Sequence, residues 1–216
     1  MEAKKNIKGI PSGYSEIDMV TSGWKPSDLI VIAGRPEVGK TSFALLMARY
    51  IAVDENIPLA YFSLDLSNVQ LVSRLLDAEK IQRPDEWKRL DKDVNVLMDA
   101  PLYVDDTQEM SLADIRTKVQ ELVHQHNVQI IIIDNLQLLN TTPSCHSLKD
   151  MAVELNIPII VVSQQDDGNV SQFKDFNDAD IVLSVNRPDG NDRDAQVVIS
   201  KNGKDETGEV MIRLKK

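Results

Sequence analysis

The chain has 216 residues, 42% of them hydrophobic, which is enough for one well-cored domain and too few for two of ordinary size. Its formal net charge of -10 argues against a protein that grips nucleic acid through a strongly basic face. Because the chain has a single cysteine, Cys145, and no apolar run of about 18 residues, an internal disulfide is excluded, and we expect a cytoplasmic protein that does not enter a membrane.

The first elements of the chain predict a phosphate-binding loop. Residues 1–8 form a short polar stretch, typical of a flexible N-terminus, and residues 9–216 are expected to form one domain. Residues 29–33 form an apolar run typical of a buried strand, and apolar residues at helical spacing follow Lys40. Between them lies a segment that fits the pattern G-x-x-x-x-G-K-[ST]: Gly34, Arg35, Pro36, Glu37, Val38, Gly39, Lys40, Thr41 and Ser42.

This loop is predicted to bind ATP together with Mg²⁺. Gly34 and Gly39 let the backbone curl, so that successive N–H groups and the helix N-terminus point at phosphate oxygens. Lys40 would reach the β- and γ-phosphates, and Thr41 would place its hydroxyl on Mg²⁺. The alternative is a glycine-rich turn before an ordinary helix, which the flanking strand and helix disfavour.

Strands and helices then alternate. A helix is predicted behind a capping pattern at Ser67, and another behind a similar pattern at Ser111. The first of these helices carries an expected apolar stripe of Val69, Val72, Leu75 and Leu76. Further strands are predicted from short apolar runs at residues 58–64, 102–104, 128–133 and 158–162. The alternation predicts an α/β fold with a mostly parallel sheet flanked by helices.

The tail of the chain has a different character. Three strands are expected at residues 181–185, 197–200 and 210–214, separated by turn signals and with no room for helices between them. Such strands predict antiparallel pairing at the C-terminal edge of the sheet.

Polar residues stand where three of the predicted parallel strands end. In an open parallel sheet, ligands bind beyond the carboxyl ends of the strands. Asp134 follows four isoleucines and would hold Mg²⁺ through its water shell. Asp65 is placed to orient or deprotonate an attacking water, and Gln164 to touch the γ-phosphate. Each could simply end a strand, but their joint occurrence with the loop favours phosphoryl transfer.

Several segments resemble the motor domain of the DnaB-type replicative DNA helicases. They are residues 9–13, 23–45, 62–67, 131–138 and 161–164, with 178–182 and 199–202 extending the match over nearly the whole chain. The resemblance implies a RecA-like P-loop NTPase fold, a hexameric ring with ATP sites between subunits, and ssDNA threaded through the centre. It implies ATP hydrolysis that drives ssDNA translocation and duplex unwinding in DNA replication. It also implies that Lys201 acts in trans on a neighbour's γ-phosphate.

Two residues depart from the family pattern. Asp65 stands where the family has a catalytic glutamate, whose side chain is one methylene longer. Gly203 stands where the family has an arginine that acts in trans; Lys201 remains nearby, but a lysine lacks the planar fork of an arginine.

Two loops depart from the family pattern as well. The loops between residues 139 and 148 and between 165 and 180 are shorter than the family's basic, DNA-contacting loops, and the second is acidic, which opposes phosphate binding. Phe173 and Phe176 of the acidic loop could stack on bases. The simpler interpretation is that they pack the shortened loop onto the domain.

These departures keep a second hypothesis open. The chain could be a degenerate helicase paralogue that binds nucleotide but acts as a regulatory or assembly protein beside a related helicase, without unwinding. A third class, a generic RecA-like recombinase or clock-type ATPase, is disfavoured by residues 9–13 and 178–182, which resemble the helicase family specifically.

Overall fold

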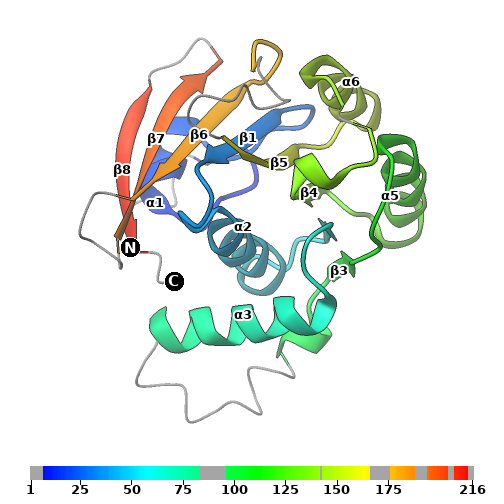
Figure 1. The fold of residues 1–216 in the computed structure, drawn as a ribbon, viewed down its shortest axis with the longest axis horizontal. Coiled ribbons are helices and arrows are strands. Elements are labelled where there is room, and N and C mark those ends of the chain that lie inside the picture. Colours follow the sequence, from blue (N-terminus) through cyan, green and yellow to red (C-terminus); the bar gives the residue numbers. More distant parts are fainter. Residues whose placement is uncertain are drawn as a thin grey trace.

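The computed structural model describes residues 7–82, 96–141, 143–165, 176–187, 194–203 and 207–213. An eight-stranded sheet runs through the centre of the molecule, with helices on both faces (Figure 1). The N-terminus that we expect to be flexible lies, up to residue 6, outside these ranges. Across the ranges described, no helix has the length and apolar character needed to cross a membrane.

The strands form one sheet in the order β3-β2-β4-β5-β1-β6-β7-β8. Their bounds are β1 (Leu29–Gly34), β2 (Leu59–Ser63), β3 (Leu102–Asp105), β4 (Ile130–Asp134), β5 (Ile159–Gln164), β6 (Ile181–Asn186), β7 (Asp194–Asn202) and β8 (Gly208–Arg213). The helices are α1 (Ser15–Thr21), α2 (Lys40–Arg49) with a π-helical extension (Tyr50–Asp54), α3 (Asn68–Gln82), α5 (Leu112–His126), a 3-10 turn (Leu136–Leu138) and α6 (Cys145–Leu155).

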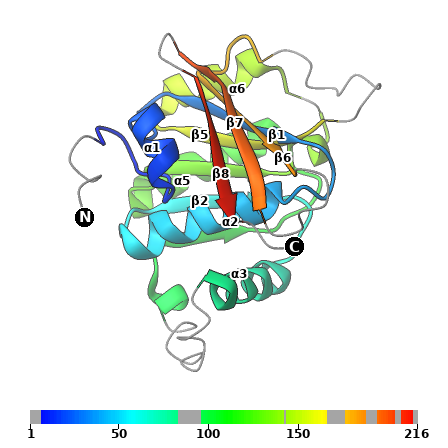
Figure 2. The same cartoon turned by 90° about the vertical axis from the view of Figure 1, so that its left-hand side faces the viewer.

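The pairing confirms an α/β fold with a mostly parallel sheet and antiparallel strands at its C-terminal edge. Neighbouring strands from β3 through β6 are all parallel, and β7 and β8 are antiparallel to their predecessors. Figure 2 shows β7 and β8 at this edge, beside α1. The three tail strands pair antiparallel with one another, as predicted, and β6 also pairs in parallel with β1, which joins the tail to the parallel part of the sheet.

The parallel strands are apolar throughout because both faces of the sheet are covered. Ile30 and Ile32 of β1 belong to the cluster shared with α2 and α3, whereas Leu29 and Val31 belong to the cluster shared with α5 and α6. All six residues of β1 are buried. A strand buried on both faces shows a continuous apolar run in sequence, which is why the periodicity identified these strands.

Both predicted capping patterns are present. The backbone N–H of Ser67 donates to Gln70 Oε1 at 3.0 Å, and the N–H of Gln70 donates back to Ser67 Oγ at 3.4 Å. Ser111 and Asp114 form the reciprocal pair at the start of α5. Each pair satisfies backbone N–H groups that have no partner inside the helix, and so fixes where the helix begins.

The apolar stripe predicted for α3 is wrong in half of its residues. Leu71 and Leu75 are buried, but Val69 is 79% exposed and Val72 is 44% exposed. The buried face of α3 is set by its packing against α2. Residues at helical spacing define several possible faces, and the neighbouring helix decides which one is buried.

Candidate nucleotide-binding site

The phosphate-binding loop has the strand, loop and helix order that its sequence predicts. β1 ends at Gly34 and α2 begins at Lys40, with Gly39 at φ 101° as its N-cap. A side chain at position 34 would place a Cβ 2.4 Å from the carbonyl oxygen of Val185 in β6. Only glycine fits where the two backbones approach this closely, so packing alone requires the first glycine of the loop.

Lys40 and Arg187 hold the loop from two sides. Lys40 is 8% exposed, and its Nζ donates to the carbonyl oxygen of Arg35 at 2.6 Å. Arg187, just beyond β6, donates from Nε to the carbonyl oxygen of Val38 at 3.0 Å. The ammonium of Lys40 therefore lies folded over the loop, at the position from which a lysine contacts bound phosphates.

Asp134 is buried at the end of β4, and both of its carboxylate oxygens accept hydrogen bonds. Thr41 donates from Oγ1 to Oδ1 at 3.3 Å, and Tyr61 donates from its hydroxyl to Oδ2 at 2.8 Å. Burial raises the pKa of Asp134 above its ordinary value, and the two hydroxyl donors partly oppose that shift. The structure therefore brings together the two residues predicted to bind the metal, Thr41 at the start of α2 and Asp134 at the carboxyl end of β4.

Tyr61 is a site residue that the sequence did not predict. It lies in β2, is only 1% exposed, and has a pKa raised well above the usual tyrosine range by burial and by the neighbouring Asp134. In sequence, Tyr61 looks like one more core residue of an apolar strand. The signal that could have found it is that a buried tyrosine hydroxyl usually needs a hydrogen-bond partner.

Asp65 and Gln164 lie on the same side of the sheet as Gly34, where the parallel strands have their carboxyl ends. Gln164 is the last residue of β5 and pairs in register with Gly34. β2 ends at Ser63 rather than at the predicted Asp65, because Ser63 Oγ hydrogen-bonds to the backbone of Leu66 and turns the chain. Asp65 lies within this turn as an exposed residue, and its charge contributes to the raised pKa of Asp134.

Gln137 is a second residue that sequence reasoning missed. Its side-chain Nε2 donates to Ser163 Oγ at 2.8 Å and to the carbonyl oxygen of Gln164 at 3.0 Å. These bonds fasten the 3-10 turn after β4 to the end of β5. The ends of the two strands that carry Asp134 and Gln164 are thus tied to each other.

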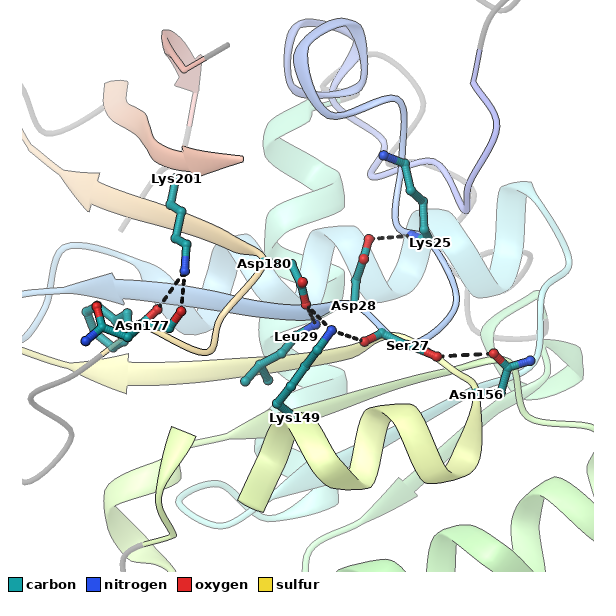
Figure 3. Close-up of polar contacts among 10 residues, drawn as sticks. Lys25, Ser27, Asp28, Leu29, Lys149, Asn156, Asn177, Asp180 and Lys201 are labelled. Atoms are coloured by element: carbon teal, nitrogen blue, oxygen red, sulfur yellow. Dashed lines mark hydrogen bonds and ion pairs between the residues drawn. The ribbon is translucent and has the colours of Figure 1, made fainter. Parts of the chain in front are cut away.

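Lys201 lies away from this group. In register it is level with Val182 of β6 and so with Val31 of β1, three residues or about 10 Å short of Gly34 along the strand. Its Nζ donates to the carbonyl oxygens of Phe176 and Asn177, at 3.2 and 2.5 Å (Figure 3). The structure therefore brings together Lys40, Thr41 and Asp134 but not Lys201.

The donor set fits a magnesium-bound nucleotide. A threonine hydroxyl and a carboxylate are oxygen ligands of the kind that Mg²⁺ prefers, directly or through water. An ionised carboxylate as deeply buried as Asp134 gains most from a nearby cation, since burial opposes its charge. The loop backbone and the start of α2 present N–H groups suited to phosphate oxygens.

Most of the acidic loop, residues 166–175 with Phe173, lies outside the described residues. Phe176 packs against the cluster of buried residues around α5 and α6. This agrees with the interpretation that Phe176 attaches the loop to the domain, in place of the alternative that it stacks on bases.

The chain is similar to curated replicative helicases. Over 95% of its length it is 33% identical to the replicative DNA helicase DnaB of Geobacillus stearothermophilus, and over 97% it is 32% identical to the replicative DNA helicase DnaC of Bacillus subtilis. These matches cover 54% and 55% of the two relatives. The chain therefore spans about half the length of the curated relatives it matches.

Two solved structures share the fold. One, described as an ATPase domain, superposes with a TM-score of 0.83 at 25% identity, covering 99% of this chain and 93% of that domain. A DnaB-like replicative helicase, described with its interactions with primase, superposes with a TM-score of 0.81 at 25% identity, covering 97% of this chain and 60% of that one. The pattern of the DnaB-like helicase C terminal domain matches residues 9–216. The chain belongs to the DnaB-like helicase C-terminal domain family, whose members include the ATPase domains of replicative DNA helicases.

Proposed function

We propose that residues 9–216 form one RecA-like ATPase domain that binds Mg-ATP at the phosphate-binding loop and hydrolyses it to drive ssDNA translocation in DNA replication. The observation that carries this proposal is the contact between Thr41 and Asp134, which joins the loop to the end of β4 at 3.3 Å. A threonine and an aspartate in this arrangement are the protein groups that position Mg²⁺ in P-loop NTPases.

Each residue of the site has a proposed role. Lys40 would bind the β- and γ-phosphates, while Thr41 and Asp134 would hold Mg²⁺, which when bound neutralises charge on the phosphate oxygens. Asp65 would orient the attacking water from the turn after β2. Gln164, fastened through its backbone by Gln137, would contact the γ-phosphate.

We propose that Lys201 acts in trans. It lies two strands across the sheet from β1 and about 10 Å short of Gly34 along the strand direction, and its side chain turns toward residues 176 and 177, so it cannot serve the loop of its own subunit. A neighbouring subunit could use it, as the family resemblance implies for a ring with ATP sites between subunits. The partners proposed are therefore further copies of this chain in a hexamer, or a related helicase, with ssDNA in the centre.

A second candidate is a nucleotide-binding regulator or assembly protein without unwinding activity. It is supported by the exposed Asp65, whose short side chain extends from a turn, and by Gly203, which offers no side chain where the family has an arginine. Arginine fingers contribute about 10³–10⁵ in rate where they act, so their loss separates binding from turnover.

The test is phosphate release from Mg-ATP, with and without ssDNA, using Lys40→Ala as the blank. The ATPase proposal predicts turnover above the blank that rises with ssDNA. Binding of a fluorescent ATP analogue without turnover would refute hydrolysis and favour the regulator. A forked-duplex assay then separates unwinding by the chain itself from an effect on an added replicative helicase.

A further inference from the structure

Asp180 joins the start of β1 to the end of β7. Its backbone N–H donates to the carbonyl oxygen of Leu29 at 2.9 Å, and its own carbonyl oxygen accepts from the N–H of Gly203 at 2.7 Å. Its carboxylate accepts from the N–H of Leu29 at 2.8 Å and from Lys149 Nζ at 2.6 Å (Figure 3). One residue thus fixes the strand that leads into the phosphate-binding loop and the strand that carries Lys201.

Lys149 completes the connection from α6. Besides its ion pair with Asp180, its Nζ donates to the carbonyl oxygen of Ser27 at 2.7 Å (Figure 3). Its side chain is 25% exposed and that of Asp180 is 32% exposed, so solvent screens the pair only in part. The ammonium spans the segment just before β1 and the carboxylate just before β6, which holds the two strand starts side by side.

Lys201 rests on the turn that Asp180 ends. The N–H of Ala179 donates to the carbonyl oxygen of Phe176 at 3.0 Å, which closes a turn over residues 176–180. The ammonium of Lys201 binds the first two carbonyls of that turn, those of Phe176 and Asn177. The turn is therefore anchored through Asp180, its last residue, and the carbonyl groups of its first two residues bind Lys201.

We propose that Asp180 and Lys149 are positioning residues for Lys201: their ion pair sets the place of the turn over residues 176–180 and of the end of β7, and so the point from which Lys201 reaches a neighbouring subunit. This inference rests on the proposed trans role of Lys201. Lys201 cannot reach the loop of its own subunit, and the ion pair contacts β1 at the end remote from Gly34. Loss of the ion pair should therefore impair the site of the neighbour and leave the subunit's own loop intact.

The first experiment measures position directly. In Asp180→Asn, the amide keeps an oxygen for the N–H of Leu29 but loses the charge that binds Lys149. Hydrogen exchange should speed up at the amides of Ala179 and Gly203 and stay unchanged in α2. Glu154→Gln is the matched control, because Glu154 lies on the same helix α6 and pairs with Arg116 at 3.1 Å on the surface. It should leave both regions unchanged.

The second experiment measures turnover and nucleotide binding. Misplacement of a contacting group by about 1 Å can lower a rate by about 100-fold, so Asp180→Asn and Lys149→Met should each lower ATP turnover by about 10- to 100-fold. Affinity for a fluorescent ADP analogue should stay within about twofold, because Asp180 and Lys149 contact the start of β1, at the opposite end of that strand from the loop. A merely structural role would lower binding and turnover together.

Mixing provides the decisive readout. Lys40→Ala has a disabled loop and an intact β7–β8 hairpin, whereas Asp180→Asn has the reverse. A mixture of the two should turn over more ATP than the sum of the separate proteins, as should a mixture of Lys40→Ala with Lys201→Ala. Restored turnover with Lys201→Ala but not with Asp180→Asn would overturn the inference, as would unchanged exchange at Ala179 and Gly203. Absence of turnover in the unmodified protein would instead overturn the proposed hydrolysis, and this inference with it.

Discussion

Replacing Tyr61 with phenylalanine should destabilise the protein by an amount that depends on pH. The Tyr61 hydroxyl donates to Asp134 Oδ2 at 2.8 Å, and both groups are buried. Phenylalanine keeps the ring and leaves one carboxylate oxygen without this donor. A hydrogen bond to a charged group contributes about 1.5–3 kcal/mol, so we expect a loss of about 2 kcal/mol when Asp134 is ionised. For a chain of this length, that corresponds to a fall in Tm of roughly 4–8 °C.

The sign of the pH dependence follows from the raised pKa of Asp134. Because burial favours the protonated form, ionisation of Asp134 opposes folding, and Tyr61→Phe raises the pKa further. The loss should be greatest above the folded pKa. As pH falls through that pKa, Asp134 becomes protonated and the bond becomes a neutral one, of about 1 kcal/mol.

Urea unfolding of the unmodified protein and Tyr61→Phe at about pH 8, and again at the lowest pH at which both proteins still fold, checks this reasoning. Tyr103→Phe is the matched control, since Tyr103 stacks on His126 at 4.4 Å between ring centroids. Equal losses for Tyr61→Phe at both pH values would refute the argument. A loss in Tyr103→Phe with the same pH dependence would do so as well.

Three further substitutions test the loop and the departures from the family. Gly34→Ala should lower the free energy of unfolding by about 1–3 kcal/mol and weaken nucleotide binding, because its Cβ would lie 2.4 Å from the carbonyl oxygen of Val185. Gly208→Ala is the control, since its Cβ would have its nearest neighbour at 3.5 Å, and it should change neither quantity in thermal unfolding or nucleotide titration. Asp65→Glu should raise ATP turnover by extending the carboxylate one methylene toward the water; unchanged or lower turnover contradicts this role. Gly203→Arg meets nothing within 4 Å, so it should raise turnover despite a strain of about 1–2 kcal/mol at φ 56°, and a lower Tm without faster turnover would argue against a trans contact there.

The parts of the fold that sequence predicted are those set by local signals. Strands such as β4 are buried on both faces and are identified by unbroken apolar runs, and the helix caps at Ser67 and Ser111 depend on residues three positions apart. The exposed Val69 and the direction of β6 depend on contacts with distant elements, which periodicity does not contain. The predicted stripe of α3 therefore needed correction, and the parallel pairing of β6 with β1 was not predicted.

The candidate site shows the same division. A spacing pattern located Lys40 and Thr41, and the end of an isoleucine run located Asp134. Tyr61 could not be found this way, because its hydroxyl meets Asp134 only once β2 and β4 lie side by side. Gln137 was missed for a similar reason, since its partners at the end of β5 come from a different strand. Side chains that complete a site across neighbouring strands are visible only after the strand order is known.

The distance between the phosphate-binding loop and Lys201 makes the dilution behaviour of the protein informative. With Lys201 acting in trans as proposed, a lone subunit holds the two halves of different sites, so its turnover per subunit should fall when the protein is diluted. A two-fold dimer completes both sites by reciprocal contact, a closed ring completes one site at each head-to-tail interface, and an open row leaves one loop unmatched at its end. By mass action, turnover per dilute subunit rises in proportion to concentration for a dimer and more steeply for a larger ring. The steepness of that rise therefore reports how many subunits must meet before any of them works.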